Sequence, residues 1–291
     1  MFRLDRFLTL HAFRHLMRVY PQSKGIRIPI LMYHSISDEP EKGHPYYWIN
    51  TSPKLFAEQM QFLHDNKYKV ISLEEACSAL NSNLQPATRN PQPVTDNLVV
   101  LTFDDGYLDF YTDAFPALQR FGYTATIFLP TAFIGNSKPG LAGKKHLDWG
   151  HVRELKQQGI SFGSHTVNHR QLWKCEDSVL ESELRESRKT IEEKAGEGVE
   201  TFCYPYWFPE QDKIFVVRIK ELLRNCGYLC GTGTRIGTIH QPGEKMVLKR
   251  IPLNSADDLC LFSEKLSGNY DWLQIIQRAY KMFKTRKIDT I

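Results

Sequence analysis

The sequence lacks any long apolar run. None of its stretches approaches the roughly 20 apolar residues that a membrane-spanning helix requires. Within residues 1–20, charged residues interrupt every apolar stretch and no small-residue cleavage site follows, which is unlike a secretory signal. These absences predict a cytoplasmic protein with neither a membrane span nor an export signal.

The sequence also lacks a concentrated basic region. Lys and Arg total 37 against 33 Asp and Glu, so the formal net charge is only +4. A nucleic-acid-binding surface needs basic residues gathered on one element or stripe, so we expect no nucleic-acid partner. Residues 1–25 and 269–291 are locally basic and are predicted to be helices, the first amphipathic and packed on the domain, the second with a solvated face. The alternative for both is peripheral contact with an anionic membrane surface.

Cysteines are few and scattered. Of the six, only Cys226 and Cys230 lie close together in the sequence, and no second pair has the spacing of a structural zinc site. In a chain of this size, such a distribution predicts reduced, partly buried thiols rather than a disulfide framework.

Short apolar stretches alternate with helical patterns along most of the sequence. The segments predicted to be strands are 26–33, 70–71, 98–103, 125–129, 160–162, 202–204, 228–231 and 247–253. The segments predicted to be helical are one from residue 53 onward, 73–80, 109–121, 149–158, 176–195, 212–225, 256–266 and 271–283. Residues 81–97, rich in Asn, Pro, Gln and Ser, predict a loop. No internal repeat is present, and the alternation favours an α/β fold with a parallel, barrel-like sheet.

Two adjacent acids, Asp104 and Asp105, follow the predicted strand 98–103 directly, and Gly106 follows them. Neighbouring side chains point in different directions, so one carboxylate can bind a metal while the other remains free to take a proton. Taken alone, the segment is equally consistent with an ordinary Asp-Asp-Gly turn. Its place at the end of a strand is where barrel enzymes carry their chemistry.

Two histidines, His165 and His169, come soon after the predicted strand 160–162. On a helical turn, a spacing of four residues puts both imidazoles on one face, about 6 Å apart, which suits one shared metal ion. The alternative is two unrelated polar histidines, since the chain has ten. With one carboxylate added, three protein ligands would leave a position open for water, as in catalytic metal sites.

Three segments together resemble the motifs of a known family. TFDDGY (102–107), SHTVNH (164–169) and FCYPY (202–206) are similar to the first three motifs of the polysaccharide deacetylases, the NodB-homology enzymes of carbohydrate esterase family 4. LMYHS (31–35) resembles the opening strand of the branch that includes the poly-N-acetylglucosamine deacetylases. The resemblance implies a distorted (β/α) barrel, which we expect over 26–268 between the two terminal helical segments.

The same resemblance implies an activity and roles for individual residues. The activity is hydrolysis of the N-acetyl group of an amino sugar in a saccharide, with zinc or another divalent ion such as cobalt or nickel. Three residues would hold the metal: Asp105, His165 and His169. Asp104 would be the general base on the attacking water, and the backbone N–H of Tyr206 would help to hold the oxyanion, in a turn fixed by Pro205.

The sequence departs from the family pattern at three places. Cys203 stands where many members have an arginine that pairs with the base, and we hypothesise that Arg250 takes a comparable place near Asp104. The last strand lacks the histidine that often serves as general acid, so His34, at the end of the first strand, is the candidate for that role. Trp207 replaces a common glycine and is predicted to narrow the groove, to stack on a sugar ring or to be a core aromatic.

Two other functions remain consistent with these residues. One is a C–N amide hydrolase that acts on a small non-sugar substrate. The other is a degenerate barrel retained as a carbohydrate-binding module, which the missing arginine and histidine favour and the complete Asp-Asp-His-His set opposes.

Overall fold

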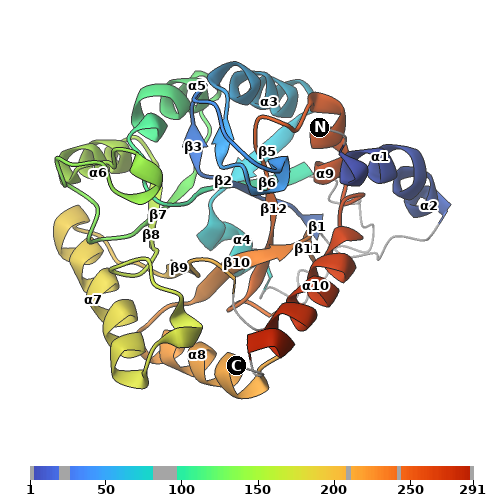
Figure 1. The fold of residues 1–291 in the computed structure, drawn as a ribbon. Helices are drawn as coiled ribbons and strands as arrows, with labels where there is room; N and C mark the ends of the chain where they lie inside the picture. The colour runs from blue at the N-terminus through green and yellow to red at the C-terminus, as the bar shows by residue number, and fades with distance from the viewer. Residues whose placement is uncertain (1–2, 20–26, 81–96, 208–210, 241–243, 289–291) are drawn as a thin grey trace, which may run out of the picture.

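The fold is a parallel barrel surrounded by helices (Figure 1). The computed structural model describes residues 3–19, 27–80, 97–207, 211–240 and 244–288. The sheet has the order β2-β12-β10-β9-β8-β7-β6-β5, and an additional pairing of β2 with β6 closes seven of these strands into a ring. The strands are β2 (Ile30–Tyr33), β5 (Tyr68–Ile71), β6 (Asn97–Phe103), β7 (Thr126–Leu129), β8 (Ser161–Ser164), β9 (Thr201–Cys203), β10 (Cys230–Ile236) and β12 (Leu248–Pro252). The predicted (β/α) barrel is therefore confirmed.

Helices cover the outside of the ring and one of its ends. Those outside are α3 (Pro53–Asp65), α5 (Phe115–Phe121), α6 (Trp149–Gln157), α7 (Asp177–Ala195), α8 (Lys213–Asn225), α9 (Leu259–Leu266) and α10 (Leu273–Ile288). Helix α4 (Leu73–Ala79) lies behind the barrel in Figure 1 and shares a buried cluster with the strand residues Val100, Phe128 and Leu248. It closes the end where the strands begin, which leaves the carboxyl ends of the strands for the site.

Two helix starts follow from local sequence, as predicted. The Ser52 hydroxyl caps α3 by accepting the N–H of Leu55, and Pro53 occupies the first turn, where no N–H is needed. Ser72 and Glu75 form a reciprocal capping box at the start of α4.

Other predicted limits were wrong. The strand predicted at 228–231 begins at Cys230 and continues to Ile236. Its C-terminal part was missed because Gly231 and Gly233 interrupt the apolar pattern by which strands are predicted. A Cβ on Gly231 would lie 2.7 Å from the carbonyl oxygen of Met246, so the close approach of the chains requires glycine there. The single strand predicted at 26–33 is divided into β1 (Arg27–Ile28) and β2, with residue 26 outside the described part.

Three further segments also differ from the sequence prediction. The helix predicted at 109–121 consists of a π-helical turn at Phe110–Ala114 followed by α5. The helix predicted from residue 256 starts only at Leu259, where the Asp258 side chain caps it by accepting the N–H of Leu261. Of the loop predicted at 81–97, residues 81–96 lie outside the described part and Asn97 already belongs to β6.

The N-terminal segment packs against the C-terminal part of the domain. It consists of α1 (Leu4–Leu8), a π-helical turn (Thr9–Phe13) and α2 (Arg14–Val19). The Phe13 ring stacks on Trp272 at 4.4 Å, and the Trp272 indole N–H donates to the Thr9 hydroxyl at 3.0 Å. Across the described ranges, none of the helices combines the length and the apolarity that crossing a bilayer demands. The alternative of contact with a membrane surface is not tested by these contacts, and the domain limits at 25/26 and 268/269 stay predictions.

All six cysteines are free thiols, as predicted. Four of them are buried and two are partly or fully exposed, which fits thiols that fill space in the core rather than crosslink it.

Candidate active site

The side chains of Asp104 and Asp105, at the carboxyl end of β6, point in different directions. Asp105 has a left-handed backbone with φ of 71°, and Gly106 continues it with φ of 59°. The left-handed φ of Gly106 favours glycine at this turn, and a Cβ there would also lie 2.8 Å from the Leu129 side chain. Non-glycine residues rarely adopt a left-handed φ, and they are concentrated at functional sites. The backbone of Asp105 is therefore held in this conformation by the surrounding structure.

Asp105 meets two histidines from the end of β8. Its Oδ1 lies 3.5 Å from Nε2 of His165 and 3.2 Å from Nε2 of His169, and the two imidazole rings are 4.8 Å apart. All three side chains are at most 10% exposed. Oδ1 of Asp105 and Nδ1 of His169 are buried without a hydrogen-bond partner in the part of the chain that the structure describes. The orphaned Oδ1 of Asp105 calls for an explanation, and the donor set of one carboxylate and two imidazoles fits a divalent metal ion.

The helical turn predicted for the two histidines was wrong. The segment between them is an irregular loop in which Thr166 and His169 both adopt left-handed backbones, with φ of 67° and 53°. Reversals of the chain, rather than helical periodicity, therefore bring the rings together. Nδ1 of His165 lies 2.8 Å from the carbonyl oxygen of Cys203. As donor to that carbonyl it fixes the tautomer that leaves Nε2 free to face Asp105.

A buried carboxylate, Glu183 on α7, holds this loop. Its Oε2 accepts the backbone N–H groups of Val167 and Asn168, both at 2.8 Å, and its Oε1 accepts the Asn168 side-chain amide at 2.7 Å. Arg170 adds an ion pair at 3.1 Å. Sequence reasoning missed Glu183 because it is one of many acids on a charged helix. Only its position on the face that carries Leu180 and Leu184 could have indicated burial.

Replacement of Glu183 by Gln is expected to weaken metal binding by roughly 10–100-fold, the usual cost of losing a partner that orients a ligand. The amide would turn a donor toward N–H groups that need an acceptor, and the left-handed loop would lose its support. A cobalt(II) titration measures the effect. Glu186→Gln, on the exposed face of the same helix, is the matched control, and equal affinities in the two variants would contradict this role.

His146 supports the second acid in a similar way, and it too was missed. Its Nδ1 lies 2.8 Å from the carbonyl oxygen of Asp105, and its Nε2 lies 3.1 Å from the backbone N–H of Leu141. Since Nε2 must accept that N–H, Nδ1 carries the proton and donates to Asp105. The ring therefore connects the loop before α6 to the left-handed backbone of Asp105.

Asp104 forms a buried, two-bonded ion pair with Arg250. Nη1 lies 2.6 Å from Oδ1 and Nη2 lies 2.7 Å from Oδ2, with the two side chains 0% and 4% exposed. Burial by itself raises the pKa of the Asp104 carboxyl, but the charge and hydrogen bonds of Arg250 outweigh it and hold this pKa below its usual value. Arg250 thus lies where the sequence hypothesis placed it, although it comes from β12 rather than from the motif at Cys203.

The remaining predicted residues surround this centre. Nε2 of His34 lies 3.8 Å from Oδ2 of Asp104, with 22% of the side chain exposed, so it stands at the rim. Tyr206 has φ of 58° and its ring lies 4.7 Å from that of His169. Pro205 is buried just before it. Trp207 faces Trp173 with ring centroids 6.0 Å apart, so the two indoles form an aromatic pair near the histidine loop.

Comparison with known proteins identifies the family of this chain. Residues 92–228 match the family profile described as polysaccharide deacetylase. YxkH of Bacillus subtilis strain 168, whose name places it among the polysaccharide deacetylases, is 30% identical over 228 residues, which is 78% of this chain and 72% of that protein. The chain belongs to the polysaccharide deacetylase family.

Other members extend the likeness. The poly-β-1,6-N-acetyl-D-glucosamine N-deacetylase of Escherichia coli K12 is 29% identical over 147 residues, 47% of this chain but only 20% of that protein. The Streptococcus pyogenes deacetylase PplD, solved in complex with acetate, superposes with a TM-score of 0.67 at 27% identity and covers 83% of this chain and 99% of that one. IcaB from Ammonifex degensii, at 19% identity and a TM-score of 0.63 over 84% and 98% of the two chains, shares the fold.

Proposed function

We propose that this protein is a metal-dependent hydrolase that removes N-acetyl groups from an amino-sugar-containing saccharide. The observation that carries the proposal is the pairing, at one end of the barrel, of the Asp105–His165–His169 group with a separate ionised carboxylate, Asp104. The activities in the names of the E. coli and S. pyogenes relatives support the same chemistry.

Zinc is the proposed ion, with cobalt or nickel as alternatives. One carboxylate and two imidazoles are a common ligand set of catalytic zinc sites, and three protein ligands leave a position open. When bound, the ion supplies Lewis acidity, which polarises a carbonyl and lowers the pKa of water.

The residues beside the Asp105–His165–His169 group have separate roles in proton transfer, oxyanion binding and substrate binding. Asp104, kept ionised by Arg250, takes the proton of the water that attacks the acetyl carbon. The backbone N–H of Tyr206 donates to the oxygen on which negative charge develops. Pro205 fixes the turn that presents this N–H, and Trp207, paired with Trp173, offers a face for a sugar ring.

His34 is proposed to donate a proton to the leaving amine. It lies next to Asp104 yet reaches solvent, as a proton donor at the rim must. We expect His34→Ala to lower turnover by about 10²–10⁴-fold, the usual contribution of a general acid, with metal content unchanged. His64→Ala, an exposed histidine on α3, is the control. Near-normal turnover of His34→Ala would mean that His34 only packs against Asp104.

Acetate release from N-acetylglucosamine oligomers tests the proposed function. The metal-loaded protein should release acetate, chelation should abolish release, and addition of zinc should restore it. A cyclic amide serves as the substrate of the alternative amide hydrolase, and we expect no turnover of it. Zinc-bound protein that hydrolyses only the cyclic amide, or neither substrate, would overturn the proposal.

A further inference from the structure

A second group of potential metal ligands overlaps the first. Asp104, His165 and Cys203 are all buried, and one ligand atom from each lies within 4.8 Å of the others. His165 belongs to both groups. Sγ of Cys203 is 3.6 Å from Oδ2 of Asp104, so the thiol and the carboxylate are neighbours, and the imidazole of His165 is within reach of both. Zinc, cobalt and cadmium all bind ligand sets of this kind.

Arg250 already occupies the space between two of these ligands, Asp104 and Cys203. Its Nη1 and Nη2 bind both oxygens of Asp104, and Nη2 also lies 3.1 Å from Sγ of Cys203. Nη1 also reaches the Thr102 hydroxyl at 3.2 Å and Nε the Gly233 carbonyl at 3.0 Å, so all five guanidinium N–H donors have partners.

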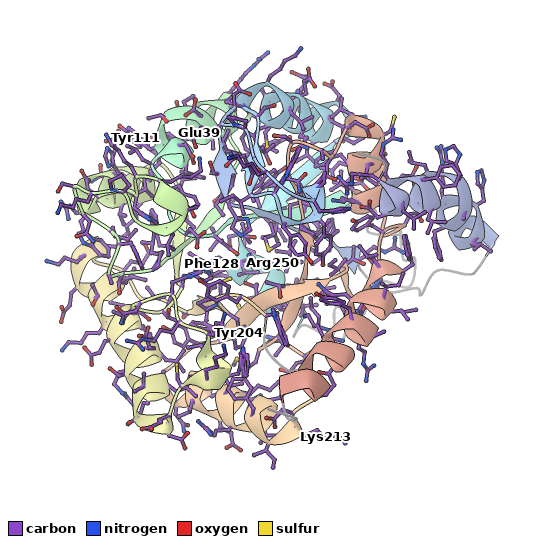
Figure 2. The ribbon with its side chains drawn as sticks, viewed as in Figure 1. Glu39, Tyr111, Phe128, Tyr204, Lys213 and Arg250 are labelled. Carbon is purple, nitrogen blue, oxygen red and sulfur yellow. The ribbon has the colours of Figure 1, made fainter. Side chains whose placement is uncertain are left out.

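The arginine is also held rigidly from the side. The Phe128 ring lies under the guanidinium, with 5.8 Å between the Cζ atom and the ring centroid, and the side chain is fully buried. Figure 2 shows Arg250 and Phe128 close together near the centre of the barrel. A fully buried guanidinium whose five donors all have partners is a positive charge held in one place.

We propose that Arg250 excludes metal from the Asp104–His165–Cys203 group and so confines it to the Asp105 site. A divalent cation would have to displace a fixed positive charge and every hydrogen bond that the charge makes to two of the three ligands. The inference rests on the proposed function and adds a reason for it. If the ion could bind through Asp104, this carboxylate would serve as a metal ligand and could no longer act as the general base.

Loss of Arg250 should therefore allow a metal ion to bind the Asp104–His165–Cys203 group. In Arg250→Met, a thiophilic ion gains access to Asp104 and Cys203 while keeping His165. Coordination through Sγ forms a metal–sulfur bond and releases the thiol proton to solvent, with no change in oxidation state. The bound ion also neutralises the carboxylate that the substitution leaves unpaired.

Cobalt(II) absorption spectroscopy tests this. Wild-type protein should bind cobalt with d–d bands only, and Arg250→Met should add the near-ultraviolet thiolate-to-cobalt charge-transfer band. The band should disappear in Arg250→Met/Cys203→Ser, and Cys203→Ser alone should leave the wild-type cobalt spectrum unchanged. Should Arg250→Met fail to fold, Arg250→Gln replaces it, because the amide is polar but carries no charge that could exclude a cation.

The outcomes separate this inference from the proposed function. A thiolate band in the wild-type protein, or a folded, cobalt-bound Arg250 variant without the band, overturns the exclusion by Arg250. Failure of the wild-type protein to bind cobalt overturns the Asp105 site instead, and a thiolate band confined to the Arg250 variant would still support the exclusion.

Discussion

Asn in place of Asp104 is expected to lower turnover by about 10²–10⁴-fold while metal binding persists, because an amide cannot take the proton of the attacking water. The carboxylate belongs to a buried, two-bonded pair, so the substitution also leaves the Arg250 charge poorly compensated. Breaking such a pair costs about 3–5 kcal/mol, which should appear as a lower midpoint of thermal unfolding.

Initial rates of acetate release, metal content and thermal unfolding of the Asp104→Asn protein together test this expectation. Asp113→Asn, an exposed acid on the following helical turn, is the matched control. Normal turnover of Asp104→Asn would remove Asp104 as the base. Loss of metal together with turnover would show that Asp104 is a ligand, contrary to the exclusion assigned to Arg250.

Asn in place of Asp105 is expected to remove the metal itself. Oδ1 of Asp105 is the negatively charged member of the group, lies 3.2–3.5 Å from both histidine nitrogens, and has no hydrogen-bond partner among the described residues. Loss of an orienting partner already costs 10–100-fold in affinity, so loss of this ligand should cost about 10²-fold or more, with a parallel loss of acetate release.

Metal analysis of the purified Asp105→Asn protein and its cobalt(II) titration check this result. Asp65→Asn, an exposed acid at the end of α3, is the control. Retention of one tightly bound ion would show that Asp105 is not the anionic ligand. The two acids thus predict opposite phenotypes, since the Asp104 variant keeps the metal and loses proton transfer, and the Asp105 variant loses both.

Local sequence was informative where one segment contains the whole signal. Ser52 and Ser72 cap their helices through atoms only three residues away, so the helix starts were predictable. The strand β10 was not fully predictable, because Gly231 is required by the approach of Met246 from another segment. The conformation of the histidine loop was missed for a similar reason, since Glu183 stabilises it from a separate helix.

The sequence by itself determined the alternating fold, because apolar periodicity lies within single segments. It also proposed the four residues Asp104, Asp105, His165 and His169, because the short motifs that resemble a known family lie within single segments. Only the tertiary structure decided how these residues are supported. It brings Glu183 under the histidine loop, His146 against the Asp105 carbonyl and Arg250 onto Asp104. Each of these partners comes from a different element, and contacts between distant elements depend on how the barrel closes. Of these partners, only Arg250 was suggested by the sequence, through resemblance to a family. Its contact with Cys203, one of the second group of potential metal ligands, could be found only in the folded chain.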